Sequence, residues 1–362
     1  MKPSLSIRKQ PTTKPAQRET NPSVARQAIH RVVDRRTLSR GEVDFPCVPA
    51  LGERYTTQLL DVWRAIGRPF APSELESLCQ NVERALSTGY AVSPFARMVV
   101  SYEAPPPPLA GIRYTIRLKE PTMEEHYAHW AAERKPPLFG AHPDRKIIAV
   151  AADLGDPASV PVLDVGAGTG RNAIALARLG HPTDALEPVS VLAQQIRSSA
   201  AAEQIPLRVI EAEVLAAELS LAPGAYKFIV LAEVVSHFRS VKDVRVAFAK
   251  FVDALMPGGI LLINTFLSME GYKPDALARQ VSETAWSCIF TRADLAFITE
   301  ELPFDRISDE SVYEHEKKHL PAEAWPPTGW FVDWSQGRNV FDLPAGKAPI
   351  DLRWLAYRRR GS

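Results

Sequence analysis

The chain has 362 residues, enough for one large domain and a smaller one, because domains typically contain about 100–200 residues. A hydrophobic fraction of 46%, a charged fraction of 23% and a net charge of +1 are ordinary for a soluble globular protein, and they favour neither nucleic acid nor an anionic membrane as partner. Three scattered cysteines and the lack of an apolar run of about 18 residues argue against a disulfide framework, a zinc cluster and a membrane span, so we expect a cytoplasmic protein.

Residues 1–44 are expected to form a disordered basic tail. Residues 1–40 hold ten Lys or Arg but only two acidic residues, Glu19 and Asp34. Four prolines interrupt any helix, and no core-forming pattern is present. An organellar transit peptide is the alternative, but the prolines spoil the continuous amphipathic helix that it needs.

Residues 45–121 predict a small α+β domain. Helical spacing of apolar residues marks 55–66, and a second helix is expected from about 73 to 86. Two runs rich in β-branched and aromatic residues, 96–103 and 111–119, predict a two-stranded ribbon whose connector contains four prolines.

Residues 122–362 predict the main domain, in which short apolar strands alternate with helices. Such alternation implies parallel strands with right-handed crossovers, and therefore a doubly wound, Rossmann-like, mostly parallel seven-stranded sheet. The expected strands are 162–165, 183–186, 207–210, 228–232, 260–266, 304–313 and 351–357. The expected helices are 122–134, 143–154, 171–179, 189–202 and 241–255.

The most informative motif follows the first of these strands and reads Val162-Leu163-Asp164-Val165-Gly166-Ala167-Gly168-Thr169-Gly170-Arg171-Asn172. Glycines allow the backbone to turn sharply and to approach a ligand closely. The helix that begins directly afterwards offers free N–H groups and a partial positive charge to an anionic group, such as a ligand carboxylate.

The glycine spacing separates two ligand classes. A dinucleotide fingerprint needs G-x-G-x-x-G, and the position of its third glycine is occupied by Arg171. The observed G-x-G-x-G, with Asp164 two residues before the first glycine, resembles motif I of class I S-adenosylmethionine-dependent methyltransferases. This resemblance implies that Asp164 and the loop backbone hold the methionine part of the cofactor.

Acidic residues after the next two strands fit the same resemblance. A carboxylate at Glu187 can accept both hydroxyls of a ribose. Glu213 and Val214 occupy the place where the family grips the adenine, and the Met256-Pro257-Gly258-Gly259 turn before a later strand is also similar. The cofactor-binding residues expected from the resemblance are Asp164, Gly166, Ala167, Gly168, Gly170, Glu187, Pro188, Glu213, Val214 and Glu233.

The methyl acceptor leaves a weaker signature, because methyl transfer from a sulfonium depends mainly on alignment. Ala232-Glu233-Val234-Val235 stands where DNA amino-methyltransferases carry an Asx-Pro-Pro-Tyr type motif, so nucleic acid is not expected as a substrate. No carboxylate cluster accompanies Glu233, so no metal is expected either.

Two groups of residues are candidates for the acceptor side. His237, beyond the fourth strand, is a candidate general base with Glu233 as its orienting partner; the alternative is a His that caps or packs the following loop. Tyr313, His315, Trp330 and Trp334 are candidates for acceptor binding; the alternatives are a solvated strand end for the first two and a satellite core for the tryptophans.

The sequence thus predicts an S-adenosylmethionine-dependent methyltransferase acting on a small molecule, such as a natural product. The N-terminal domain is expected to help form the acceptor site or a homodimer contact. Two alternatives stay open: a peptide or protein methyltransferase in which the ribbon pairs with an extended substrate, and a non-catalytic S-adenosylmethionine-binding partner of another enzyme.

Overall fold

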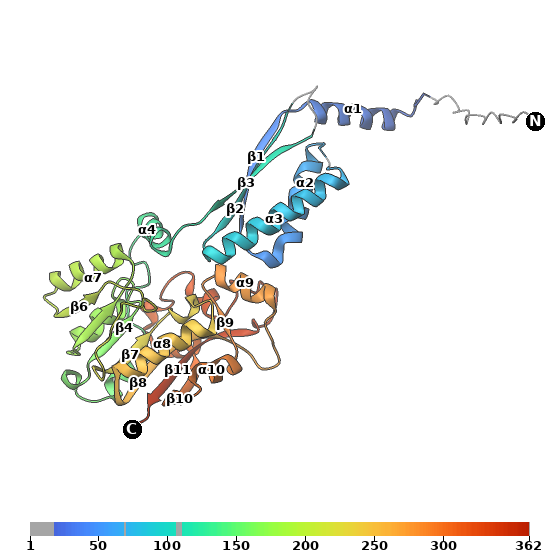
Figure 1. The fold of residues 1–362 in the computed structure, drawn as a ribbon. Helices are drawn as coiled ribbons and strands as arrows, with labels where there is room; N and C mark the ends of the chain where they lie inside the picture. The colour runs from blue at the N-terminus through green and yellow to red at the C-terminus, as the bar shows by residue number, and fades with distance from the viewer. Residues whose placement is uncertain (1–17, 69, 106–110, 362) are drawn as a thin grey trace, which may run out of the picture.

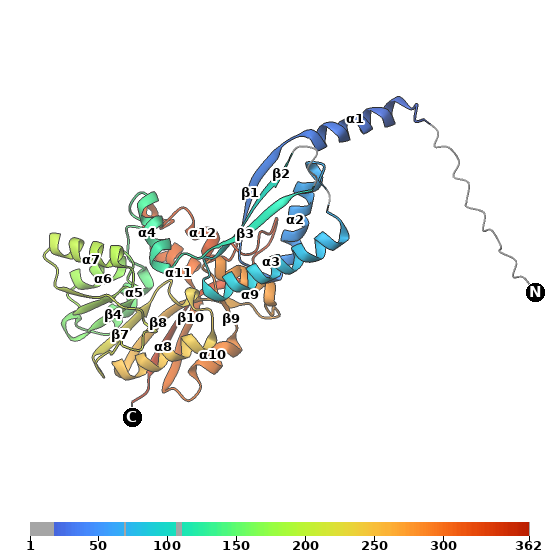
Figure 2. The same ribbon diagram turned by 45° about the horizontal axis from the view of Figure 1, so that its top comes forward.

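The computed structural model describes residues 18–68, 70–105 and 111–361, which form two lobes (Figures 1 and 2). The N-terminal lobe is a three-stranded antiparallel sheet with two helices packed against it. The larger lobe is a mostly parallel sheet with helices on both faces. No helix in the described part of the chain is long and apolar enough to cross a membrane.

The N-terminal lobe is built around one apolar cluster. Residues at helical spacing, such as Leu59, Trp63, Leu78 and Val82, pack against Met98 and its neighbours on the sheet, and these five side chains are fully buried. The elements of this lobe are α1 (Pro22–Arg36), β1 (Ser39–Pro46), the 3₁₀ turn Pro49–Leu51, α2 (Gly52–Ala65), α3 (Pro72–Val92), β2 (Arg97–Ala104) and β3 (Arg113–Lys119).

The structure contradicts the expected disorder of residues 22–44, which contain helix α1 and most of strand β1. Pro22 stands at the first helical position of α1, where its missing N–H costs nothing, and the Asn21 side chain caps the helix by accepting from the Ser23 N–H at 3.0 Å. Strand β1 then pairs with β2 along its whole length, so the predicted two-stranded ribbon is a three-stranded sheet. Residues 1–17 of the expected tail lie outside the described residues.

The large lobe confirms the predicted doubly wound sheet. Seven strands follow the order β10-β11-β8-β7-β4-β5-β6, and the two-residue strand β9 pairs with β8. Strands β4 to β8 pair in parallel, while β11 joins β8 and β10 antiparallel. The strands are β4 (Val162–Val165), β5 (Thr183–Leu186), β6 (Leu207–Ile210), β7 (Tyr226–Leu231), β8 (Leu255–Ser268), β9 (Ile289–Phe290), β10 (Phe304–Ser311) and β11 (Ile350–Arg359).

The helices of the large lobe cover both faces of this sheet. They are α4 (Met123–Glu133), α5 (Arg145–Asp153), α6 (Arg171–Arg178), α7 (Ser190–Ala202), α8 (Val241–Ala254), α9 (Ala276–Thr284), α10 (Arg292–Thr299), α11 (Val312–His319) and α12 (Phe331–Ser335), with 3₁₀ turns at Pro157–Ser159, Val235–His237 and Ala322–Ala324. The predicted strand 304–313 ends at Ser311, so Tyr313 and His315 lie on α11 rather than on a strand end.

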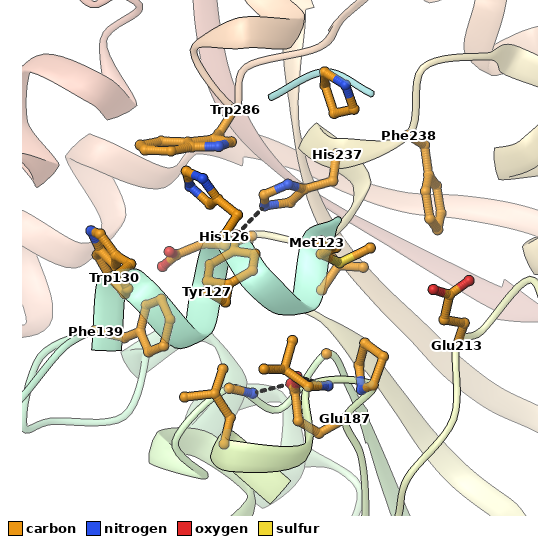
Figure 3. A pocket seen from close by; sticks show the side chains of 18 of the residues that line it. Met123, His126, Tyr127, Trp130, Phe139, Glu187, Glu213, His237, Phe238 and Trp286 are labelled. Atoms are coloured by element: carbon orange, nitrogen blue, oxygen red, sulfur yellow. Dashed lines mark hydrogen bonds between the residues drawn. The ribbon is translucent and has the colours of Figure 1, made fainter. Parts of the chain in front are cut away.

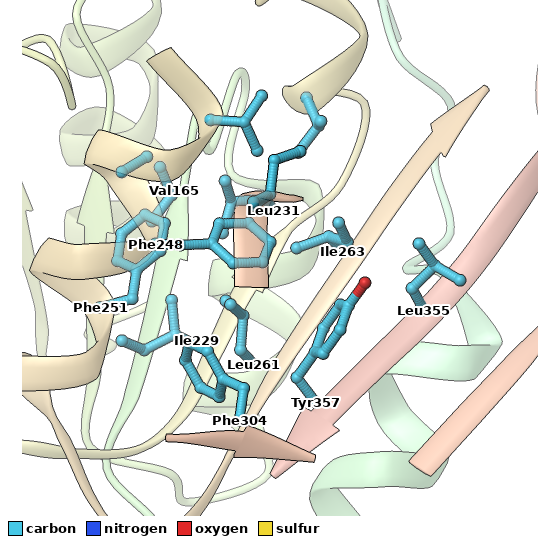
Figure 4. Close-up of a cluster of buried hydrophobic side chains, with 14 of the residues drawn as sticks. Val165, Ile229, Leu231, Phe248, Phe251, Leu261, Ile263, Phe304, Leu355 and Tyr357 are labelled. Carbon is cyan, nitrogen blue, oxygen red and sulfur yellow. The ribbon is translucent and has the colours of Figure 1, made fainter. Parts of the chain in front are cut away.

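Alternation along the central strands produces two separate apolar layers. On β7, Ile229 and Leu231 face a cluster that includes Phe248 of α8, as Figure 4 shows. Phe228 and Val230 face the opposite cluster, which contains residues of α5, α6, α11 and α12. Because both faces are buried, the central strands are apolar almost throughout, and their carboxyl ends meet at one edge of the sheet.

Candidate active site

The glycine loop lies where β4 ends and α6 begins. Gly166, Gly168 and Gly170 have φ values of 67°, 57° and 83°, in the left-handed region that favours glycine. A Cβ on Gly166 would lie 2.4 Å from Cγ2 of Val234, so no larger residue fits without displacement. The loop therefore presents backbone to the space above the strand ends, as the sequence predicts.

Two buried carboxyl groups flank this loop. Glu187 accepts hydrogen bonds from the backbone N–H groups of Gly168 at 2.7 Å and Val189 at 2.9 Å, and thereby joins the loop to the start of α7. Asp164 is 2% exposed, and its Oδ2 has no hydrogen-bond partner among the described residues. Burial raises the pKa of each carboxyl to about 7.

A cavity of about 800 Å³ opens above these groups, between the carboxyl ends of the strands, α4 and residues 92–95 of the N-terminal lobe. Of the predicted cofactor residues, all but Gly170 line it. Gly170 instead caps α6, and its backbone is packed against Ile174. The other nine are Asp164, Gly166, Ala167, Gly168, Glu187, Pro188, Glu213, Val214 and Glu233.

Comparison with known families agrees with this geometry. Residues 124–308, just over half of the chain, match the family model described as a methyltransferase domain. The chain belongs to the class I S-adenosylmethionine-dependent methyltransferase family. Its cofactor is therefore S-adenosylmethionine.

Several solved structures resemble the methyltransferase at low identity. Geranyl diphosphate methyltransferase in complex with S-adenosylmethionine shares 13% identity over 60% of this chain and 85% of its own, with a TM-score of 0.47. A proposed sarcosine dimethylglycine methyltransferase from Galdieria sulphuraria shares 16% identity over 60% and 85%, with a TM-score of 0.45. The (4+2)-cyclase SpnF shares 17% identity over 60% and 81%, with a TM-score of 0.42. No curated protein matches the chain.

The half of the cavity away from Glu187 and Glu213 is aromatic (Figure 3). Trp286 and His126 have ring centroids 5.7 Å apart, and Phe95 of the N-terminal lobe stacks on His126 at 4.1 Å with an interplanar angle of 6°. Four residues of α4 line the cavity but were not predicted from the sequence to belong to the site: Met123, His126, Tyr127 and Trp130. Their spacing of three and four residues was a usable signal, because it places them on one face of the helix.

The structure brings His237 into the methyltransferase cavity but not against Glu233. A hydrogen bond of 3.3 Å joins its Nε2 to the Tyr127 hydroxyl. Burial lowers the pKa of His237 to about 4, so the ring is neutral at neutral pH and a weak base. The predicted orienting partner, Glu233, is instead paired with Arg171, and that part of the prediction is wrong.

Arg171 connects three elements through buried charges. Its guanidinium donates to both carboxylate oxygens of Asp144, at 2.6 and 3.0 Å, and to Oε1 of Glu233 at 3.2 Å. The side chains of Arg171 and Asp144 are only 8% and 5% exposed. The residue that excludes a dinucleotide fingerprint is thus the centre of an ion-pair network beside the methyltransferase cavity.

The four predicted acceptor-binding residues divide into two pairs. Trp330 and Trp334 line the cavity, and both also pack in the apolar layer that contains Phe266. Tyr313 and His315 do not line it, because α11 turns them toward other partners: Tyr313 packs on Trp325, and His315 is 2.9 Å from Glu310. The expectation that this second pair binds the acceptor is therefore wrong.

No group of three or more His, Cys, Asp or Glu side chains within the described ranges is arranged to hold a metal ion.

Proposed function

We propose that this methyltransferase methylates a small, uncharged aromatic acceptor that binds in the aromatic half of the cavity. One observation carries the proposal: a single cavity contains both the glycine loop with its acids and the aromatic group around Trp286. When bound, S-adenosylmethionine supplies an activated methyl group on a sulfonium. The chain's contribution is to align the acceptor with that methyl group and to exclude water.

The residues beside the loop suit this cofactor. The Asp164 carboxyl, whose Oδ2 has no hydrogen-bond partner among the described residues, fits an ammonium group of the methionine part. The Glu187 carboxylate fits a pair of ribose hydroxyls. Glu213 and Val214, farther along the cavity wall, are suited to the adenine. The glycines leave room for the ligand to contact the backbone.

The aromatic half disfavours a cationic acceptor. Burial lowers the pKa of both His126 and His237, so both rings are neutral at neutral pH. The Arg134 guanidinium lies 4.5 Å from the ring centroid of Trp130, and Phe95 covers a face of His126. These ring faces are thus occupied, and Arg134 would repel a cationic acceptor.

Calorimetry tests the cofactor half of the proposal. We expect S-adenosylmethionine to bind with a dissociation constant in the micromolar range, about −8 kcal/mol, and NAD to show no binding. Glu187→Gln should weaken binding by roughly 10- to 100-fold, because hydrogen bonds to a charged group contribute about 1.5–3 kcal/mol. Since the pKa of Glu187 is raised to about 7 without ligand, affinity should fall as the pH drops below that value and the carboxylate is protonated.

Glu211→Gln is the matched control for this measurement, because Glu211 pairs with Ser190 and Arg197 outside the cavity. Binding of NAD but not of S-adenosylmethionine would refute the proposed function. Equal affinity of the Glu187→Gln and Glu211→Gln variants would instead refute only the role given to Glu187.

The two tryptophans of the cavity wall should respond differently to truncation. Trp334 is 7% exposed, and its indole N–H donates to the Trp286 carbonyl at 3.2 Å, so Trp334→Ala should destabilise the protein by about 3–5 kcal/mol. Trp330 is only partly buried, so Trp330→Ala should weaken binding of 2-naphthol by about 2- to 10-fold, the loss of one aromatic contact of about 0.5–1.5 kcal/mol. Urea unfolding and tryptophan fluorescence titration measure the two effects. Unchanged 2-naphthol binding by Trp330→Ala would exclude Trp330 from the acceptor site.

A further inference from the structure

We infer that Glu233 is the general base that accepts a proton from the methyl acceptor, which therefore carries its nucleophile as a hydroxyl or N–H group. The inference rests on the proposed function and assigns the proton-accepting role to Glu233 rather than to His237.

The backbone of Glu233 is held in an unusual conformation at the end of β7. Its φ is 62°, in the left-handed region that non-glycine residues rarely adopt. The Glu233 N–H donates to Oδ1 of Asn264 at 2.6 Å, and Asn264 is buried on β8. Such strain persists only where the surroundings enforce it, and it is concentrated at functional sites. Here it holds the Glu233 side chain beside the carboxyl ends of the parallel strands, where ligands bind in such sheets.

The Glu233 carboxylate is only partly engaged by protein. Arg171 donates to Oε1, and no described residue hydrogen-bonds Oε2. Arg171 itself is committed to Asp144 through two hydrogen bonds. The Glu233 side chain lines the cavity and is 21% exposed, whereas those of Arg171 and Asp144 are nearly covered. A proton acceptor must reach its substrate, and Glu233 is the carboxylate of this network that can do so.

The surrounding charges suit Glu233 to act at neutral pH. The groups that face it are Arg171 of α6, Asp144 before α5 and the Tyr127 hydroxyl of α4. Burial and the Asp144 charge raise the pKa of Glu233, and Arg171 lowers it, with the result that it lies at about 7. A base is most effective when its pKa is near the working pH. His237, with its pKa lowered to about 4, would hold the proton far more weakly.

The proposed step conserves atoms and charge. As the acceptor oxygen or nitrogen forms its bond to the methyl carbon, the bond from that carbon to the sulfonium sulfur breaks, and sulfur keeps the electron pair. The acceptor's proton passes to Oε2 of Glu233, and the neutral carboxylic acid later releases it to water.

Infrared titration tests the base without requiring turnover. The infrared spectra of wild type and Glu233→Gln should differ by one carboxyl band that titrates with a midpoint near pH 7. This is the value to which the Glu233 pKa is raised. Asp144→Asn should move this midpoint to lower pH, because it removes a negative charge that raises the pKa. The control is Glu316→Gln: burial raises the pKa of Glu316 to about 7 as well, but its carboxylate accepts from the Arg145 and Lys146 N–H groups and does not line the cavity. A Glu233 midpoint at the unperturbed value of about 4.3 overturns the inference.

Turnover of 2-naphthol with S-adenosylmethionine provides the second readout. Wild-type turnover should rise with pH to a plateau above about 7, because the deprotonated carboxylate is the active form. Glu233→Gln should lower the turnover number by about 10²–10⁴-fold and remove this dependence. Glu316→Gln should keep the rise of turnover with pH. A Glu233→Gln variant with normal turnover and an unchanged pH profile overturns the inference. Failure of the wild type to bind S-adenosylmethionine refutes the proposed function instead, and the infrared titration still decides the protonation of Glu233.

Discussion

Gly168→Val is expected to reduce the affinity for S-adenosylmethionine by more than about 100-fold, or about 3 kcal/mol, while the chain remains folded. Gly168 has a φ of 57°, which a β-branched residue adopts only with strain. Its Cβ would lie 3.2 Å from Cε2 of Phe139, so the Phe139 ring must shift to accommodate the added side chain. A shift of the loop would also lengthen the 2.7 Å hydrogen bond from the Gly168 N–H to Glu187, and thus displace the carboxylate expected to bind the ribose.

Gly271→Val is the control that separates backbone strain from damage to the site. Gly271 has a φ of 84°, but a Cβ there would meet nothing within 4 Å among the described atoms. It should therefore carry a conformational cost without a change in cofactor affinity. Calorimetric titration of both variants measures their affinity for S-adenosylmethionine. Melting temperatures measured in parallel report the conformational cost. If Gly168→Val binds S-adenosylmethionine as tightly as Gly271→Val does, the loop is not the cofactor site.

Arg171→Met is expected to destabilise the folded protein by about 3–5 kcal/mol at pH 8, because it leaves the buried Asp144 carboxylate and the Glu233 carboxylate without their cation. The penalty should shrink as the pH falls to about 5.5. Burial raises the pKa of Glu233 and Arg171 lowers it, so without Arg171 the Glu233 pKa lies further above its value in the unfolded chain. The folded state then binds more protons than the unfolded chain, and stability is lost as the pH rises.

Urea unfolding at the two pH values measures this effect. The matched control is Arg197→Met, because Arg197 pairs with Glu211 while their side chains are 40% and 36% exposed. An exposed pair of this kind contributes only about 0–1 kcal/mol. If Arg171→Met lowers the free energy of unfolding at pH 8 no more than Arg197→Met does, the buried ion-pair network does not stabilise the fold.

Local chemistry made the lining of the cavity around the glycine loop predictable from the sequence. A buried strand, a glycine loop and a helix start are consecutive in the chain, so Asp164, Gly166 and Gly168 lie together at the cavity wall. Glu187 follows the next strand, and parallel strands bring their carboxyl ends to one edge of the sheet. The amino-terminal segment was mispredicted because the strand character of β1 depends on its pairing with β2, more than 50 residues away.

Short stretches of the chain were enough to predict the alternation of strands and helices, the doubly wound sheet and a glycine spacing that departs from the dinucleotide fingerprint. Each of these depends on residues close together in the chain, where periodicity and backbone freedom act directly. The surroundings of the proposed acceptor space depend instead on contacts between distant parts of the chain. It brought Tyr127 to His237, 110 residues apart, and Arg171 to Glu233, 62 residues apart, while α11 turned Tyr313 and His315 away from the cavity. Burial and the available hydrogen-bond and charged partners orient these side chains, and spacing along the chain encodes neither.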